Sequence, residues 1–183
     1  MNLKKINWYM VILHIFLVVL AIQVLYLAKQ NRDMQALLTP SPIPTLEVGE
    51  EVAAQPVQDV SGGQQTLSFA GSDKETLLFV FNTTCPACKQ NQTNWKELYE
   101  AVQDRYNVVG VSLHPQPETQ AYIEENQLPF PVVLPESIEA FAGAFKIQAI
   151  PQTIHVDRDG KVREVKVGAL NKDAMAQLSE TAL

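Results

Sequence analysis

The sequence has few cysteines and histidines, the usual ligands of structural zinc, and no cluster of basic residues of the kind that binds nucleic acids. It has two cysteines and three histidines in 183 residues, whereas a structural zinc site needs four such ligands, usually as two spaced pairs. His14, His114 and His155 are widely separated, and their spacing predicts no metal site. The net charge is -6 and the basic residues form no concentrated patch. The composition therefore argues against nucleic acid as a partner.

The two cysteines form a single Cys-Pro-Ala-Cys motif, Cys85 to Cys88, between an apolar run and a helical pattern. Residues 76–81 predict a strand, and residues 86–106 carry apolar side chains at helical spacing. Cys85 is therefore expected at a helix N-terminus, where backbone N–H groups and the helix dipole favour a thiolate. Two thiols on a first helical turn can close a disulfide with little backbone movement. The motif indicates a redox dithiol.

A structural disulfide and a metal site are the alternatives for this pair. A structural disulfide normally joins distant segments, because closing a long loop removes more entropy from the unfolded chain. Zinc has no second ligand pair here, and copper held by both thiols and a histidine is an open alternative without support from the spacing. We predict no metal and no cofactor other than the dithiol/disulfide of Cys85 and Cys88.

The longest apolar run covers residues 8–28 and is interrupted only by His14 and Gln23. About twenty such residues cross the hydrocarbon core of a bilayer as a helix, and aromatic residues near both ends are typical of interfacial anchors. A cleaved signal peptide is the alternative, but its apolar core is usually about 7–15 residues long, and no clear small-x-small cleavage site follows here. We predict an uncleaved anchor with a single span.

The orientation of this span rests on a small charge bias. Lys4 and Lys5 precede the run, and Lys29 and Arg32 follow it, so the positive-inside signal is nearly balanced. A short N-terminal tail before a long C-terminal domain favours an N-terminus inside the cell. We predict a protein of the cytoplasmic membrane whose C-terminal domain lies in the periplasm or on the extracellular side.

Three parts are expected along the chain. Prolines at positions 40, 42 and 44 fix extended geometry and remove backbone donors, which is typical of a spacer. We predict a tail and transmembrane anchor at residues 1–28, a Pro-rich linker at 29–45 and one globular domain at 46–183.

The predicted domain alternates strand and helix patterns and ends in a hairpin and a helix. The expected elements are a hairpin over 57–68, a strand at 76–81, a helix at 86–106, a strand at 107–113, a helix at 117–127, an extended piece at 132–134, a helix at 138–145, a hairpin over 154–167 and a last helix capped by Asn171. This order implies an α/β fold with a central mixed sheet covered by helices on both faces.

These motifs resemble those of the thioredoxin-like proteins, and within them the membrane-anchored TlpA-like and redoxin-like thiol-disulfide oxidoreductases of AhpC/TSA type. The resemblance covers about residues 46–183 and rests on segments 48–50, 59–62, 81–88, 149–153 and 157–160. It implies the three-layer thioredoxin-like fold. It also implies a cis peptide bond between Ile150 and Pro151 that faces the two sulfurs.

The resemblance also assigns roles to individual residues. It implies that Cys85 is the exposed nucleophile, that Cys88 is the buried resolving thiol, and that Pro151 lies beside them. A thiolate attacks a disulfide of the partner to form a mixed disulfide, and the second thiol then displaces the partner. The residues expected to bind the partner's chain are Thr84, Pro86, Ala87, Ile150 and Thr153.

Some positions differ from the thioredoxin pattern. Thr84 stands where an aromatic residue usually precedes the first cysteine, and Phe79 stands where many members have a buried acid. The proton acceptor for Cys88 and the direction of electron flow therefore stay open. His155 is expected to be a buried or edge-strand histidine satisfied by a neighbour, and His114 a loop residue, so neither joins the predicted site.

The predicted function is that of a membrane-tethered oxidoreductase that exchanges disulfides with exported proteins, as relatives do in the maturation of cytochrome c or of periplasmic enzymes. A membrane thiol carrier is the expected electron donor or acceptor. One alternative is a redoxin-type peroxidase with antioxidant activity, whose Pro-x-x-x-Thr-x-x-Cys environment is missing here. Another is a copper-binding assembly or scaffold protein, in which three residues, rather than two, usually separate the cysteines.

Overall fold

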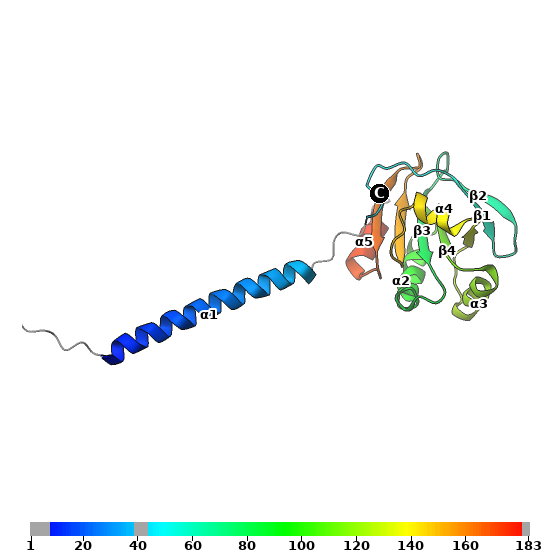
Figure 1. Ribbon diagram of the computed structural model, residues 1–183. Coiled ribbons are helices and arrows are strands. Elements are labelled where there is room, and N and C mark those ends of the chain that lie inside the picture. Colours follow the sequence, from blue (N-terminus) through cyan, green and yellow to red (C-terminus); the bar gives the residue numbers. More distant parts are fainter. Residues whose placement is uncertain (1–7, 39–43, 181–183) are drawn as a thin grey trace, which may run out of the picture. The chain divides into compact units, whose positions relative to one another are not determined.

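The computed structural model describes residues 8–38 and 44–180. Contacts divide the chain into two compact units, Met1–Pro42 and Ile43–Leu183. The first unit contains one long helix, and the second contains a seven-stranded sheet with helices on both of its faces (Figure 1). The cysteine motif belongs to the second unit.

Helix α1 (Trp8–Leu38) is the one helix of the described residues that is long and apolar enough to cross a membrane. The apolar part, Trp8–Arg32, has 25 residues, and about 20 are enough for one span. The helix continues beyond residue 28, so the first part of the predicted linker is helical. The predicted tail at residues 1–7 and linker residues 39–43 lie outside the described residues.

The sheet of the second unit has the strand order β2-β1-β5-β4-β3-β6-β7. Strands β3, β4 and β5 are parallel, and the remaining pairs are antiparallel. The strands are β1 (Gln55–Asp59), β2 (Gln64–Leu67), β3 (Glu75–Phe81), β4 (Tyr106–Ser112), β5 (Val132–Pro135), β6 (Gln152–Val156) and β7 (Val162–Val167). The helices are α2 (Pro86–Val102), α3 (Gln116–Asn126), α4 (Ile138–Ala144) and α5 (Lys172–Glu180).

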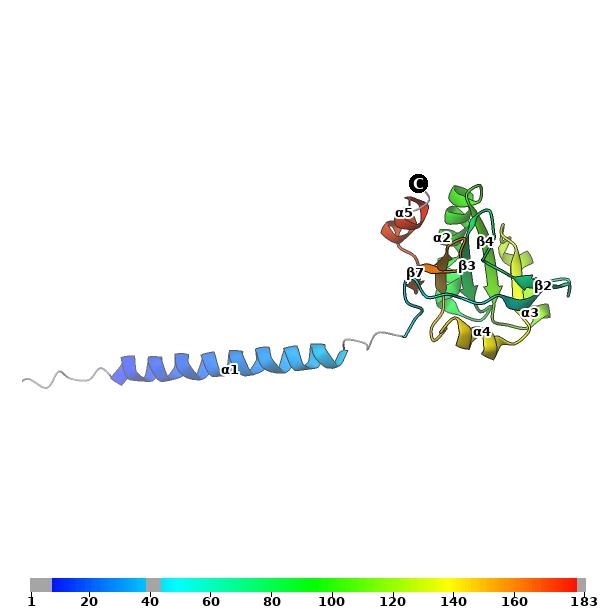
Figure 2. The ribbon, with the colours of Figure 1, turned by 90° about the horizontal axis from the view of Figure 1, so that it is seen from above.

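Strand β3 lies inside the sheet and separates two hydrophobic cores. Leu78 and Val80 face the core that contains Phe141 of α4 and Phe145, the residue after α4. Leu77, Phe79 and Phe81 face the core built with side chains of α2, α3 and α5. Figure 2 shows α2 and α5 on one side of the sheet and α4 on the other. A strand that is buried on both faces reads as a continuous apolar run, which explains residues 76–81.

The predicted elements are all present, and one boundary needs correction. The helix predicted to reach residue 106 ends at Val102, and Tyr106 begins β4. Tyr106 lies four residues after Val102, so its side chain continued the helical spacing. In the fold, Tyr106 pairs with Glu75 of β3 and packs edge to face on His155, with ring centroids 5.2 Å apart. Tertiary packing, rather than local pattern, sets this boundary.

Gly110 of β4 lies against side chains that leave no room for a methyl group. A Cβ added there would lie 3.0 Å from Phe130 Cε2 and 3.0 Å from Val132 Cγ2. We expect Gly110→Ala to lower the free energy of unfolding by about 1–3 kcal/mol, because overpacking displaces these neighbours. Chemical denaturation of the full chain in detergent measures the effect.

Gly143→Ala in α4 is the matched control for this substitution. A Cβ at Gly143 meets nothing within 4 Å, and alanine favours a helix over glycine by about 0.5–1 kcal/mol. The control should therefore be neutral or stabilising. An equal loss of stability in both variants would contradict the close packing of Gly110.

Candidate redox site

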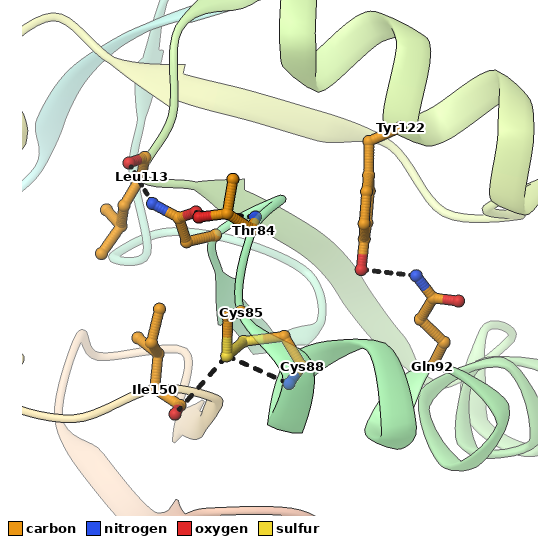
Figure 3. The surroundings of a disulfide bond; sticks show 8 residues. Thr84, Cys85, Cys88, Gln92, Leu113, Tyr122 and Ile150 are labelled. Atoms are coloured by element: carbon orange, nitrogen blue, oxygen red, sulfur yellow. Dashed lines mark hydrogen bonds between the residues drawn. A yellow bond between two sulfur atoms is a disulfide. The ribbon is translucent and has the colours of Figure 1, made fainter.

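The loop that follows β3 is held by a set of short hydrogen bonds. The Cys85 N–H donates to the Asn82 carbonyl, at 3.2 Å, which closes a turn. The Asn82 carboxamide oxygen accepts from the Thr84 N–H at 2.9 Å and from the Thr84 hydroxyl at 2.8 Å. The Asn82 amide Nδ2 donates to the Leu113 carbonyl at 3.2 Å, so the loop is joined to the end of β4 (Figure 3).

Cys85 is the N-cap of α2. Its backbone is extended, with φ -81° and ψ 114°, and its Sγ accepts from the Cys88 N–H at 3.1 Å. Pro86 occupies the first turn, where its missing N–H leaves no helical bond unmade. The helix start predicted from the sequence is confirmed. A sulfur at this position receives a backbone donor and the positive end of the helix dipole.

Cys85 and Cys88 form a disulfide with a Cα–Cα distance of 5.2 Å. Cys85 is half-buried, whereas Cys88 is fully buried in the core that contains Phe81 and Trp95. An incoming thiol therefore reaches Cys85 before Cys88. This difference in burial suits the two roles expected for the pair.

The segment before β6 passes beside the disulfide. The Ile150–Pro151 peptide bond is cis, as predicted, and the Ile150 carbonyl oxygen lies 3.9 Å from Cys85 Sγ (Figure 3). The Pro151 carbonyl accepts from the Gly168 N–H at 2.8 Å, which holds the segment on the start of the β7–α5 connection. Ile150 is half-buried and Pro151 is buried.

The residues expected to bind a partner fall into two groups. Thr84, Pro86 and Ala87 are exposed around Cys85, in reach of another protein. The Thr153 side chain is 1% exposed, and its hydroxyl accepts from Trp95 Nε1 at 3.0 Å. The Thr153 side chain thus supports α2 from the core, and a contact of Thr153 with a partner chain stays a prediction. The alternation of strand β6 turns this side chain inward, two residues after Pro151.

The surroundings of Cys88 are apolar. Phe79 stands where many thioredoxins have an acid, and it stacks on Trp95 with centroids 5.2 Å apart. A polar pair that the sequence did not reveal also lies in the surroundings of the disulfide: Gln92 of α2 donates to the Tyr122 hydroxyl of α3 (Figure 3). Burial raises the pKa of Tyr122, and the Gln92 hydrogen bond opposes this shift. Tyr122 is therefore a protonated, neutral hydroxyl at physiological pH.

Of the histidines in the second unit, His155 lies apart from the disulfide and His114 lies in a loop that supports it. His155 is fully buried, and its Nε2 lies 2.6 Å from Glu75 Oε2, so the expectation of a histidine satisfied by a neighbour is confirmed at Nε2, whereas the buried Nδ1 has no hydrogen-bond partner among the described residues. Glu75 begins β3 and Cys85 follows its other end, about 20 Å away at strand geometry. A copper site that combines His155 with the two thiols does not fit this arrangement. Within the described residues, no group of three or more His, Cys, Asp or Glu side chains is placed to hold a metal ion.

His114 lies in the loop after β4, as expected, and its Nδ1 shares a hydrogen bond with the Thr83 hydroxyl. Asn82 and Thr83 thus connect the loop before Cys85 to two consecutive residues, Leu113 and His114. Sequence reasoning missed these connections, since the partners lie 31 residues apart. The local signal for one of them was an asparagine directly after a buried strand.

The family model described as AhpC/TSA family matches residues 48–165, which include the cysteine motif and the cis-proline segment. The chain belongs to the AhpC/TSA family. The family resemblance seen in the sequence is thereby confirmed.

Curated relatives share the redox chemistry that the cysteine pair indicates. The sporulation thiol-disulfide oxidoreductase A of Bacillus subtilis is 24% identical over 121 residues, which cover 63% of this chain and 73% of that protein. The thiol-disulfide oxidoreductase ResA of Halalkalibacterium halodurans is 22% identical over 134 residues, covering 72% and 75%. With its paired cysteines, this AhpC/TSA-family chain is a thiol-disulfide oxidoreductase, as predicted.

Solved structures show the same fold. The thioredoxin domain of a thiol-disulfide oxidoreductase from Bacteroides vulgatus superimposes with a TM-score of 0.67 at 22% identity, covering 76% of this chain and all of that domain. The thioredoxin-like α/β fold, with a mixed sheet and helices on both faces, is confirmed.

Proposed function

We propose that this AhpC/TSA-family protein is tethered to the cytoplasmic membrane by α1 and exchanges disulfides with exported proteins. The observation that carries the proposal is the Cys85–Cys88 disulfide at the N-terminus of α2, with one half-buried and one buried sulfur. A solvent-side sulfur and a protected second sulfur are what a two-step exchange requires.

The proposed reduction of a client proceeds in two balanced steps. The Cys85 thiolate attacks one sulfur of the client disulfide, which forms a mixed disulfide and releases the other client sulfur as a thiolate. Cys88, once deprotonated, attacks Cys85 Sγ, forms the Cys85–Cys88 disulfide and releases the second client thiolate. Two electrons pass from the protein to the client. The reverse sequence oxidises a client dithiol.

The surface around Cys85 suits the backbone of a partner more than a particular charge. Thr84, Pro86 and Ala87 are exposed and uncharged, and the Ile150 carbonyl lies 3.9 Å from Cys85 Sγ. We propose that a client chain lies in an extended form along these residues. Cytochrome c precursors and disulfide-containing periplasmic enzymes are the client classes to test first.

The reduction potential of the pair decides the direction of the reaction. A value near or below about -250 mV makes the protein a reductant, and a value above about -150 mV makes it a disulfide donor. Either direction needs a partner that regenerates the starting state, and we propose a thiol carrier within the same membrane.

The tether predicts a difference between two assays. Removal of residues 1–42, the whole first unit, should lower turnover with the membrane-embedded carrier at least tenfold. The reason is that confinement to the membrane surface raises the effective concentration of the two partners. Turnover with a soluble thiol such as dithiothreitol should be unchanged. An equal loss in both assays would instead indicate a damaged domain and would remove the support for a functional tether.

A further inference from the structure

Asn82 takes part in most of the hydrogen bonds that hold the loop before Cys85. Three of its polar groups are engaged: the carboxamide oxygen accepts from Thr84, the amide donates to Leu113, and the backbone carbonyl accepts from Cys85. The two bonds to Thr84, at 2.9 and 2.8 Å, orient both its peptide N–H and its hydroxyl. Figure 3 shows Thr84 and Leu113, the partners of the side-chain bonds, near the disulfide.

These bonds act on a loop that has little packing of its own. Thr84 is exposed, and Asn82 and Thr83 are only half-buried. No large side chain between Asn82 and Cys85 is available to anchor the segment in a core. An asparagine whose side-chain oxygen accepts from the N–H two residues ahead imposes a turn by itself. The conformation at Cys85 therefore depends on hydrogen bonds, and the Asn82 side chain makes three of them, beside the Thr83–His114 bond and the backbone bond from Cys85 to Asn82.

The hydrogen bonds of Leu113 attach this turn to the sheet. Leu113 donates its N–H to the Phe81 carbonyl at 2.8 Å and accepts from Asn82 Nδ2 at 3.2 Å. Leu113, which follows β4, is thus hydrogen-bonded both to Phe81 at the end of β3 and to Asn82, the first residue of the loop. This arrangement holds the peptide before Cys85 in register with both strands.

We propose that Asn82 is a positioning residue of the redox centre, which sets the thiolate stability of Cys85 by holding the Thr84–Cys85 peptide in its N-cap conformation. This inference rests on the proposed exchange reaction. In that conformation Cys85 Sγ accepts from the Cys88 N–H at 3.1 Å. A bond to an anionic sulfur is stronger than one to a thiol or a disulfide, so its geometry favours the reduced, ionised state.

The test compares reduced full-length protein in detergent with its Asn82→Ala variant. The rate constant for alkylation of Cys85 by iodoacetamide, followed by mass spectrometry, should fall about three- to tenfold at pH 6 and stay unchanged above pH 9. The equilibrium constant with glutathione should shift toward the disulfide by a similar factor, and tenfold corresponds to about 30 mV.

Two further variants separate positioning from a general loss of structure. Thr84→Val removes only the hydroxyl bond to Asn82, so it should produce a smaller change in the same direction and no further change in the Asn82→Ala background. Asn107→Ala is the matched control. Asn107 is exposed at the other end of β4 and makes one side-chain bond, to Ser72 Oγ at 2.7 Å, so both redox readouts should match those of the unaltered protein.

The outcomes are distinguishable. If Asn82→Ala lowers the unfolding temperature but leaves alkylation and the glutathione equilibrium within twofold of the unaltered protein, Asn82 is only structural and the inference is overturned. If Asn82→Ala does not fold, unchanged redox readouts in Thr84→Val overturn it equally. If the unaltered protein itself forms no reversible Cys85–Cys88 disulfide, the proposed function fails, independently of Asn82.

Discussion

The Cys88→Ser variant is expected to accumulate a covalent mixed disulfide between Cys85 and its client, while multiple turnover falls to the rate of uncatalysed exchange. Cys85 is half-buried at the helix N-cap and stays able to attack, whereas the buried sulfur that releases the client is gone. Non-reducing electrophoresis of membranes that contain the variant measures the trapped adduct, and mass spectrometry identifies the sulfurs that it joins.

The reciprocal variant provides the control for this experiment. Cys85→Ser should form no trapped adduct and should also lose turnover, because Cys88 is 0% exposed and cannot meet a client sulfur. Equal adduct formation by the two variants would contradict the assigned order of attack. Identification of the trapped protein also tests the proposal that the clients are exported proteins.

Trp95→Ala is expected to lower the free energy of unfolding by about 3–5 kcal/mol, the range for deletion of a large aromatic side chain from a core. Trp95 is 1% exposed, stacks on Phe79, and donates its indole N–H to the Thr153 hydroxyl at 3.0 Å. Because a domain of this kind is stable by only about 5–15 kcal/mol, the variant should be marginally folded. Denaturant unfolding followed by far-UV circular dichroism measures the loss.

Two milder variants separate the loss of stability that comes from the missing ring volume from the loss that comes from the missing Trp95–Thr153 hydrogen bond. Trp95→Phe keeps part of the stacking on Phe79, and Thr153→Val keeps the ring but leaves its buried N–H without an acceptor, at a cost of about 1–3 kcal/mol. Both losses should be smaller than that of Trp95→Ala. A loss below about 1 kcal/mol for Trp95→Ala would show that Trp95 is not the centre of this core.

The stability of the core and the redox centre are linked through α2. This helix carries Cys88 on the same buried face as Trp95 and Leu98. Its position on the sheet therefore decides how close Cys85 comes to the Ile150 carbonyl, 3.9 Å from Sγ. Substitutions that loosen the Trp95 contact should weaken exchange as well as stability, whereas Gly143→Ala, on the other face of the sheet, should leave exchange unchanged.

The sequence by itself determined the features that depend on neighbouring residues. The apolar run of β3, the start of α2 at Cys85 and Pro86, and the hairpin with Gly62 and Gly63 follow from local pattern and turn chemistry. The presence of an apolar helix long enough to span a membrane likewise follows from composition, although the helix continues beyond residue 28. Such features need no knowledge of which strands become neighbours.

Only the tertiary structure decided the contacts between residues far apart in the chain. The inward side chain of Thr153, the Gln92–Tyr122 bond and the ties from Asn82 to Leu113 depend on sheet register and on how α2 and α3 pack. Their partners lie 58, 30 and 31 residues away, respectively. The residues next to a side chain in the sequence do not specify such pairings. In strands, a shift of one residue in register turns every side chain to the opposite face of the sheet.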